Sequence, residues 1–162
     1  MKTIDREGKR LCEFQAELFE KTVTCLEMSS EIFVRRYMNS KIVRELDSGS
    51  FLEGSMGIDD IYEEMDRQYG PSSYGSRKYH RDVMYWTGYL YRYFCYCYEV
   101  SSRQAYKLMP FKYVASSYEP YHTLDIPQAI ERLLESRGIS FSEEETNRRG
   151  VSILRSMRKM RV

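Results

Sequence analysis

The sequence predicts an all-α protein, a single-domain helical bundle of about six to eight helices with a long central aromatic helix. Three observations predict this class. The 162 residues fit one domain of ordinary size. Apolar residues recur at intervals of three and four, the spacing of one helix face, in successive segments. Serine, aspartate, glycine and proline stand at the ends of those segments, where they begin or end helices.

The first two predicted helices each have a face suited to the core. Residues 9–27 are expected to form an amphipathic helix. Its apolar face consists of Leu11, Phe14, Leu18, Thr22 and Leu26. Ser29 or Ser30 can cap a second helix, which residues 47–50 end. The apolar face of this second helix consists of Ile32, Phe33, Tyr37, Ile42, Val43 and Leu46.

A loop over residues 51–57 precedes a short helix that carries carboxylates in its early turns. Carboxylates there suit the positive end of the helix dipole. We interpret Asp59, Asp60, Glu63 and Glu64 as a solvated acidic face, because no histidine is near enough in sequence to suggest a catalytic or metal site. Residues 70–78, GPSSYGSRK, then predict an exposed connection between helices, with a hinge or binding loop as the alternative.

The aromatic segment YWTGYLYRYFCYCY, residues 85–98, belongs to a predicted helix of about five turns that begins near Asp82. Its core seam consists of Val83, Trp86, Leu90, Tyr93, Cys97 and Val100. A strand is disfavoured because neither alternate set of residues is polar. Gly88 would let a neighbouring helix cross closely. The tyrosines off the seam fit either a buried bundle or a recognition surface.

Shorter helices follow the aromatic segment. Ser101 is expected to cap a helix that Pro110 closes, and residues 110–118 add a turn or two. Asp125 and Pro127 begin a further helix that Gly138 ends, and a capping box formed by Ser142 and Glu145 predicts a last one. We therefore expect a helical domain over residues 1–140 and a basic C-terminal helix or tail over residues 141–162.

Charge and hydropathy argue against a secreted or membrane-spanning protein. Residues 1–69 carry ten basic and fifteen acidic side chains, and residues 70–162 carry fifteen and nine, so the halves have net charges of −5 and +6. This split suggests either halves that dock on each other or two differently charged faces. The mean hydropathy of −0.61 and the absence of an early apolar stretch predict a cytoplasmic protein without a signal peptide or a membrane span.

The sequence offers little support for metal binding, cofactors or catalysis. Cys12, Cys25, Cys95 and Cys97 are spaced neither as a disulfide scaffold nor as a zinc site, so we expect reduced and mostly buried thiols. The only histidines are His80 and His122, and no phosphate-binding glycine loop or nucleophile motif is present. We predict no catalytic residue, no metal site and no cofactor.

Arg92 is the only charged residue of the aromatic segment, and it suggests two interpretations. It either pairs with an acid of the acidic half, which we favour, or points toward a ligand phosphate or carboxylate. Tyrosine and arginine are enriched at interface hot spots. The predicted partner-binding residues are Tyr74, Arg77, Lys78, Tyr79, Tyr89, Tyr91, Arg92 and Tyr98.

Nucleic-acid binding is the alternative, because basic residues alternate with tyrosines in the second half of the chain. The residues for this role are Arg81, Arg103, Lys107, Lys112, Arg148 and Arg149. The tail from Arg148 to Val162 has six basic residues and no acid. A sequence pI near 7.6 is low for a dedicated nucleic-acid binder.

Three segments carry a resemblance to a protein family. They are SSEIFVRRYMNS (29–40), SSYGSRKYHRDVMYWTGYLYRYF (72–94) and YHTLDIPQAIERLL (121–134). Together they resemble a small, poorly characterised bacterial family of antitoxin-type partner proteins, encoded beside a short helical protein and an ADP-ribosyltransferase-like toxin domain. The resemblance covers about residues 11–137. It implies a non-enzymatic protein that binds and restrains a partner such as a cognate toxin, with a role in regulating its operon, and it carries over no catalytic or ligand residue.

Overall fold

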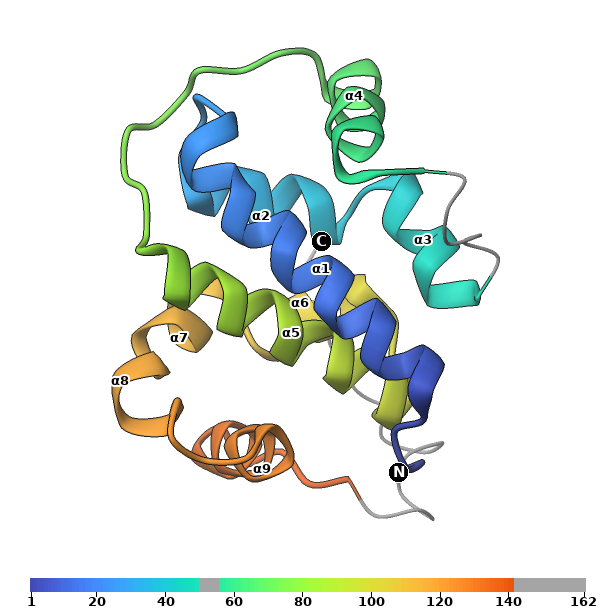
Figure 1. Cartoon of the computed structure of the whole chain (residues 1–162). Coiled ribbons are helices and arrows are strands. Elements are labelled where there is room, and N and C mark those ends of the chain that lie inside the picture. Colours follow the sequence, from blue (N-terminus) through green and yellow to red (C-terminus); the bar gives the residue numbers. More distant parts are fainter. Residues whose placement is uncertain (50–55, 142–162) are drawn as a thin grey trace, which may run out of the picture.

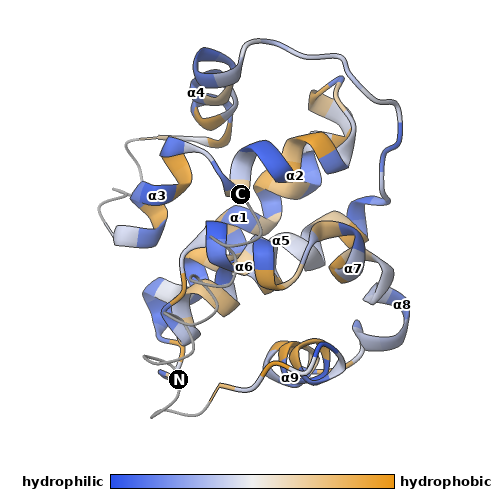
Figure 2. Ribbon diagram, turned by 180° about the vertical axis from the view of Figure 1, so that it is seen from behind, coloured by the Kyte–Doolittle hydropathy of each residue, from blue (hydrophilic) through white to orange (hydrophobic). Residues whose placement is uncertain are grey.

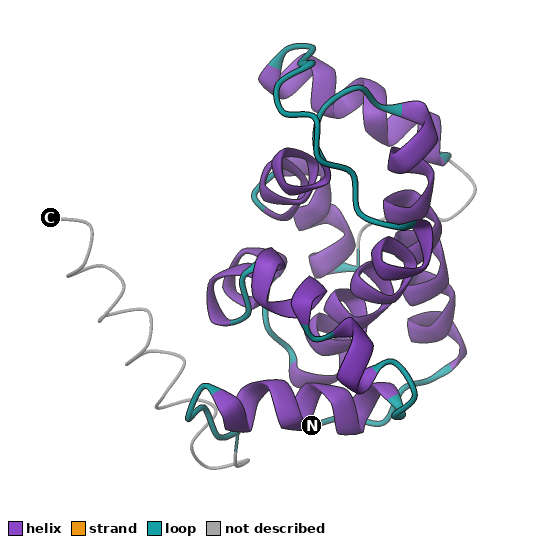
Figure 3. Ribbon diagram, turned by 90° about the vertical axis from the view of Figure 1, so that its left-hand side faces the viewer, coloured by secondary structure: helices purple, strands orange, loops and turns teal. Residues whose placement is uncertain are grey.

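The computed structural model describes residues 1–49 and 56–141 of the chain. These residues form helices joined by loops, with no β-strand among them (Figure 3), so the predicted all-α fold is confirmed. The helices are α1 (Arg6–Cys25), α2 (Ser30–Met38), α3 (Lys41–Ser48), α4 (Ile58–Tyr69), α5 (Arg81–Tyr98), α6 (Ser102–Leu108), α7 (Phe111–Ser116), α8 (Tyr118–Tyr121) and α9 (Ile126–Ser136). None of the helices in the described ranges is long and apolar enough to cross a bilayer.

Helices α1 and α5 cross at the centre of the molecule and form its most extensive helix pair. Figure 1 shows α2, α3 and α4 above this pair and α7, α8 and α9 below it. A Cβ atom on Gly88 of α5 would lie 2.8 Å from the carbonyl oxygen of Gln15 on α1 and 2.9 Å from Cγ of Phe19. The close helix crossing predicted at Gly88 is therefore confirmed, and any side chain there would push the two helices apart.

The core is continuous across the helices, because every described helix except α8 buries apolar side chains. Figure 2 shows such a stripe along α9. Its buried residues are Ala129, Ile130, Leu133 and Leu134. Aromatic rings fill the centre, where Phe19 meets Phe33 and Tyr37 edge to face at 5.5 and 5.4 Å between ring centroids. Edge-to-face contacts of this kind add to the stabilisation from burial alone.

One predicted helix is wrong in its extent. The segment expected to run unbroken to residue 46 is two helices, α2 and α3, separated at Asn39 and Ser40. The Ser40 hydroxyl donates to the Tyr37 carbonyl at 2.7 Å and accepts from the backbone N–H of Val43 at 3.2 Å. Ser40 therefore caps a new helix in a new direction. Ser29 is the cap of α2, through a 3.3 Å bond from the N–H of Ile32.

The other expected helices lie close to their predicted positions. The short acidic helix is α4, Ser101 caps α6 with Gln104 completing a capping box, and the last described helix carries Pro127 in its first turn. The capping box predicted at Ser142 and the basic tail lie outside the described residues. All four cysteines are free, and all but Cys25 are buried, as predicted for reduced thiols.

Candidate partner-binding loop

The connection between α4 and α5, residues 70–80, crosses the ends of α1 and α2 without forming a helical turn (Figure 1). Backbone hydrogen bonds hold it in place. The N–H of Ser29 donates to the carbonyl of Tyr74 at 3.1 Å, and the N–H of Ser30 donates to the carbonyl of Arg77 at 3.1 Å. The N–H of Tyr79 donates to the Ser30 hydroxyl at 3.0 Å. The loop is thus fixed to the start of α2 at three points.

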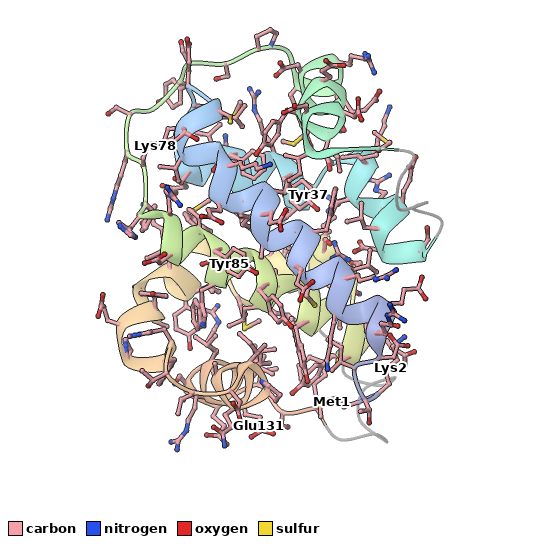
Figure 4. The ribbon with its side chains drawn as sticks, in the orientation of Figure 1. Met1, Lys2, Tyr37, Lys78, Tyr85 and Glu131 are labelled. Carbon is pink, nitrogen blue, oxygen red and sulfur yellow. The ribbon has the colours of Figure 1, made fainter. Side chains whose placement is uncertain are left out.

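Lys78 is a further anchor of this loop. Its ammonium group donates to the carbonyl of Thr22 at 3.0 Å and to the carbonyl of Leu26, at the C-terminal end of α1 (Figure 4). A positive charge there suits the negative end of the helix dipole. Partial burial lowers the pKa of Lys78. The Lys78 ammonium therefore holds the loop against α1. The predicted contact between Lys78 and a partner stays a prediction.

The loop presents Tyr74 and Arg77 to solvent. Tyr74 is 75% exposed, the highest value among the exposed large hydrophobic residues of the described chain. The guanidinium carbon of Arg77 lies 4.7 Å from the centroid of the Tyr79 ring. The Tyr79 ring in turn packs edge to face on Phe111, at 5.0 Å. The predicted partner residues Tyr74, Arg77 and Tyr79 therefore lie on one fixed segment.

Arg92 does not reach the surface, so a contact between it and a partner is excluded in this fold. The side chain is 2% exposed. Its Nη1 donates to Asp47 Oδ1 at 2.8 Å, and its Nε and Nη2 donate to Gln15 Oε1 at 3.0 and 2.8 Å. Nη2 also donates to the Ser102 hydroxyl at 3.0 Å. The favoured interpretation, an internal pair with an acid of the acidic half, is confirmed.

The groups around Arg92 are themselves hydrogen-bonded. Asp47 accepts from the backbone N–H of Ser102 at 2.9 Å and from its hydroxyl at 2.6 Å. Gln15 donates to the carbonyl of Gly88 at 2.9 Å and accepts from the Tyr37 hydroxyl at 2.9 Å. Burial by itself would lower the pKa of Arg92. The Asp47 carboxylate and other neighbouring groups raise this pKa, so the net result lies above the usual value. This polar cluster links α1, α2, α3, α5 and α6.

Two predicted partner tyrosines are also core residues. Tyr91 has no exposed surface, and its hydroxyl donates to the carbonyl of Met109. Tyr98 is 8% exposed and packs on Phe94 and Phe141, at 4.9 and 5.4 Å between centroids. The prediction of these tyrosines as surface contacts is wrong, because helices cover the second half of α5 on several sides. Tyr89 is half-buried and lies on α5, away from the residues of the loop.

The basic residues predicted for nucleic acid are spread over several helices. Arg81 at the start of α5 pairs with Glu20 at 3.1 Å, and Lys112 on α7 lies 3.6 Å from Glu31. Arg103 is exposed on α6, and Lys107 is half-buried on the same helix. Arg148 and Arg149 lie outside the described residues. The described residues of this group do not share one element.

Two features of functional interest were not predicted from the sequence. One is the role of Gln15 and Asp47 as partners of Arg92, whose only signal was an arginine inside an aromatic segment. The other is a basic cluster near Tyr69, at the end of α4, where Arg36 Nη1 also donates to the Gly70 carbonyl at 2.9 Å. The guanidinium carbon of Arg36 lies 5.3 Å from the centroid of Tyr69, and burial raises the pKa of Tyr69 while Arg36, Arg44 and Arg103 act to lower it.

The described part of the chain has no arrangement of side chains typical of a metal site. Among residues 1–49 and 56–141, no three histidine, cysteine, aspartate or glutamate side chains are placed to hold a metal ion. His80 and His122 are both exposed. Comparisons with protein-family models, with curated proteins and with solved structures find no match to this chain.

Proposed function

We propose that the protein is a non-enzymatic, cytoplasmic interaction module of antitoxin type that binds and restrains a partner protein through the loop of residues 70–80. The observation that carries the proposal is the 75% exposure of Tyr74 on a segment already held by backbone hydrogen bonds. Tyrosine is enriched at protein interfaces, where its ring buries apolar surface and its hydroxyl can hydrogen-bond to the partner. Because the loop is fixed beforehand, little conformational entropy would be lost on binding.

The side chains of the loop suit an interface. Tyrosine and arginine carry much of the binding energy in protein complexes. Arg77 is held against Tyr79, so its guanidinium is oriented before a partner arrives. The resemblance of residues 29–40, 72–94 and 121–134 to antitoxin-type proteins supports a cognate toxin as the partner, and the second of these segments contains most of the loop.

The test is co-purification of the tagged chain from a bacterial lysate, with and without nuclease. We expect a stoichiometric protein partner that survives nuclease and is lost with Tyr74→Ala plus Arg77→Ala. The melting temperature of this variant should stay close to that of the parent, because both side chains are exposed. Arg103→Ala, which removes an exposed arginine on α6, is the matched control. Retention of the partner by the loop variant would refute the proposal.

A nucleic-acid-binding regulator is the second candidate, favoured by the basic cluster of Arg36, Arg44 and Arg103 around Tyr69. Arginines beside an aromatic ring suit the phosphates and bases of a single strand. This candidate predicts that nucleic acid co-purifies, that its affinity falls steeply with salt, and that Arg103→Ala weakens it. A flat response to salt at low ionic strength would remove this candidate.

A further inference from the structure

A cavity of about 490 Å³ opens between α1, α5, α8 and the start of α9. We call it the aromatic cavity. Five rings line it, from Tyr85, Trp86, Tyr89, Tyr118 and His122, and the carboxylates of Glu20 and Asp82 lie on it as well. Its volume is within the range of pockets that hold small ligands or single side chains.

The walls of the cavity are fixed by ring packing. Trp86 and Tyr118 meet edge to face, with centroids 5.6 Å apart, and Tyr118 stacks on His122 at 4.5 Å. Tyr85 and Tyr89 are half-buried one turn apart on α5, and Figure 4 shows Tyr85 where α5 passes α1. The faces of such rings carry negative charge density and attract cations. The cavity is therefore preorganised for a group that combines positive charge with flat or apolar surface.

Acidic side chains of α1 extend the negative charge beyond the cavity. Glu13, Glu17 and Glu20 follow one another at intervals of four and three, which places them on one face of the helix. Glu20 lines the cavity itself, and although burial is the main cause of the raised pKa of Tyr85, all three glutamates raise that pKa further. Asp82 contributes a fourth carboxylate. This field disfavours an anionic ligand and favours a cationic one.

A guanidinium already lies against one of these carboxylates. Arg81 Nη2 is 3.1 Å from Glu20 Oε1, although the Arg81 side chain is 62% exposed. An exposed ion pair of this kind is weak, so another guanidinium can displace Arg81. His80 instead caps α5, because its Nδ1 accepts from the backbone N–H of Asp82 at 3.2 Å. The Arg81 contact shows that Glu20 accepts a guanidinium in the geometry it has.

We propose that the aromatic cavity binds an arginine side chain on an extended, basic peptide segment of a partner protein. Arginine is favoured over lysine because its guanidinium is weakly hydrated and stacks on aromatic faces. Glu13 and Glu17 are about 6 Å apart along α1 and Glu17 and Glu20 about 4.5 Å, and two residues of extended chain span about 6.6 Å, so two alternate arginines of the segment match the spacing of Glu13 and Glu17. The proposal goes beyond the loop interface and does not depend on it.

The direct test is a fluorescence titration, because Trp86 is the only tryptophan of the chain and it lines the cavity. The probe is acetyl-Gly-Arg-Gly-Arg-Gly-Arg-Gly-amide, and its control carries neutral citrulline at the three arginine positions. We expect a saturable change with the arginine peptide and binding at least about tenfold weaker for the citrulline peptide. Equal binding of both peptides, or no change with either at about 1 mM, would overturn the proposal.

Variants locate the binding on this surface. Glu17→Gln and Glu20→Gln are each expected to lower the affinity for the arginine peptide by about threefold. Tyr85→Leu should weaken it by a similar factor, since it removes a ring from the wall. Arg81→Gln should tighten it, because a competing guanidinium is lost. Unchanged affinity in the two glutamate variants and in Tyr85→Leu, or weaker binding to Arg81→Gln, would contradict the assignment.

Two controls separate this site from other effects. Glu135→Gln changes the charge of an exposed position on α9 and is expected to leave peptide affinity unchanged. Tyr74→Ala is also expected to leave it unchanged, so failure of the loop proposal and failure of the cavity proposal can be told apart. The melting temperature of each variant checks that the fold is retained. Equal losses in Glu135→Gln and Glu17→Gln would show non-specific charge attraction and would overturn the proposal.

Discussion

The two ends of α5 have similar residues and different environments. At its start, Tyr85 and Tyr89 are half-buried and line an open cavity. In its second half, Tyr91 and Arg92 have at most 2% of their surface exposed, and every nitrogen of the Arg92 guanidinium donates a hydrogen bond. The difference is made by the neighbours, because α1 packs along α5 and α6 contacts its second half, where only the face of Tyr93 and Tyr96 stays half-buried. Residue type alone therefore does not tell a core tyrosine from a binding tyrosine.

The largest expected effect is at the buried end. Arg92→Leu leaves the Asp47 carboxylate without its charged partner and should lower the free energy of unfolding by about 3–5 kcal/mol. Urea denaturation of the parent and the variant measures this difference. Arg103→Leu, at an exposed position of α6, should change the stability by less than about 0.5 kcal/mol. A loss no larger than that of the control would mean that the pair contributes little.

The helix crossing between the two ends is the next target. Gly88→Ala places a methyl group 2.8 Å from the Gln15 carbonyl oxygen, and the overpacking should cost about 1–3 kcal/mol. Gly57→Ala is the matched control, since the nearest contact there is 3.6 Å, from Asp60. Thermal unfolding of both variants makes the comparison. Similar melting temperatures for the two would show that α1 and α5 can separate slightly at no cost.

A pair of hydroxyl deletions compares the two ends directly. Tyr91→Phe removes a buried hydrogen bond to the Met109 carbonyl and should destabilise the fold by about 1 kcal/mol. Tyr89→Phe removes a hydroxyl from the cavity wall and should have an effect of less than about 0.5 kcal/mol. Chemical denaturation curves resolve a difference of this size. The reverse order would contradict the contrast between a core end and a surface end.

The smallest expected effect is a pH dependence at the N-terminus of α1. Asp5 accepts from the backbone N–H of Gly8 at 2.8 Å and from the Tyr96 hydroxyl at 2.8 and 2.9 Å, and these bonds lower the pKa of Asp5 below its usual 3.8. The charged form is thus favoured by folding, so its contribution is complete above about pH 4 and is lost as pH falls through the lowered pKa.

The measurement for Asp5 is the melting temperature of the parent and of Asp5→Ala at several pH values. The parent should melt higher at pH 6, and the gap should shrink toward pH 3. A gap that stays constant with pH would mean that the charge of Asp5 is not what stabilises the helix start.

Most helices could be predicted because a helix that buries one face repeats that face locally in the sequence. The break at Ser40 was missed because Ile42, Val43 and Leu46 continue the apolar spacing across it, and only the Ser40 cap reveals the change of direction. Long-range partners left no such local pattern. Asp47 is 45 residues from Arg92, so the sequence predicted the kind of partner and not its position.

The candidate surfaces could be predicted only in part, because residues far apart in the sequence form them. Tyr74 and Arg77 lie in a loop that glycine, proline and serine identify from the sequence. The aromatic cavity is made by side chains of α1, α5 and α8 and by the start of α9, and no single segment contains its pattern. Which tyrosines of α5 face it depends on where the other helices cross.

The pairing of α1 with α5 has a consequence for synthesis of the chain. Gln15 and Gly88, which meet at the helix crossing, are 73 residues apart. At about 5–20 residues per second, the ribosome needs about 4–15 seconds to make the intervening segment. During that interval the apolar face of α1 has no α5 to cover it. In a nascent chain of this protein, final closure of the core therefore waits for α5 to be made.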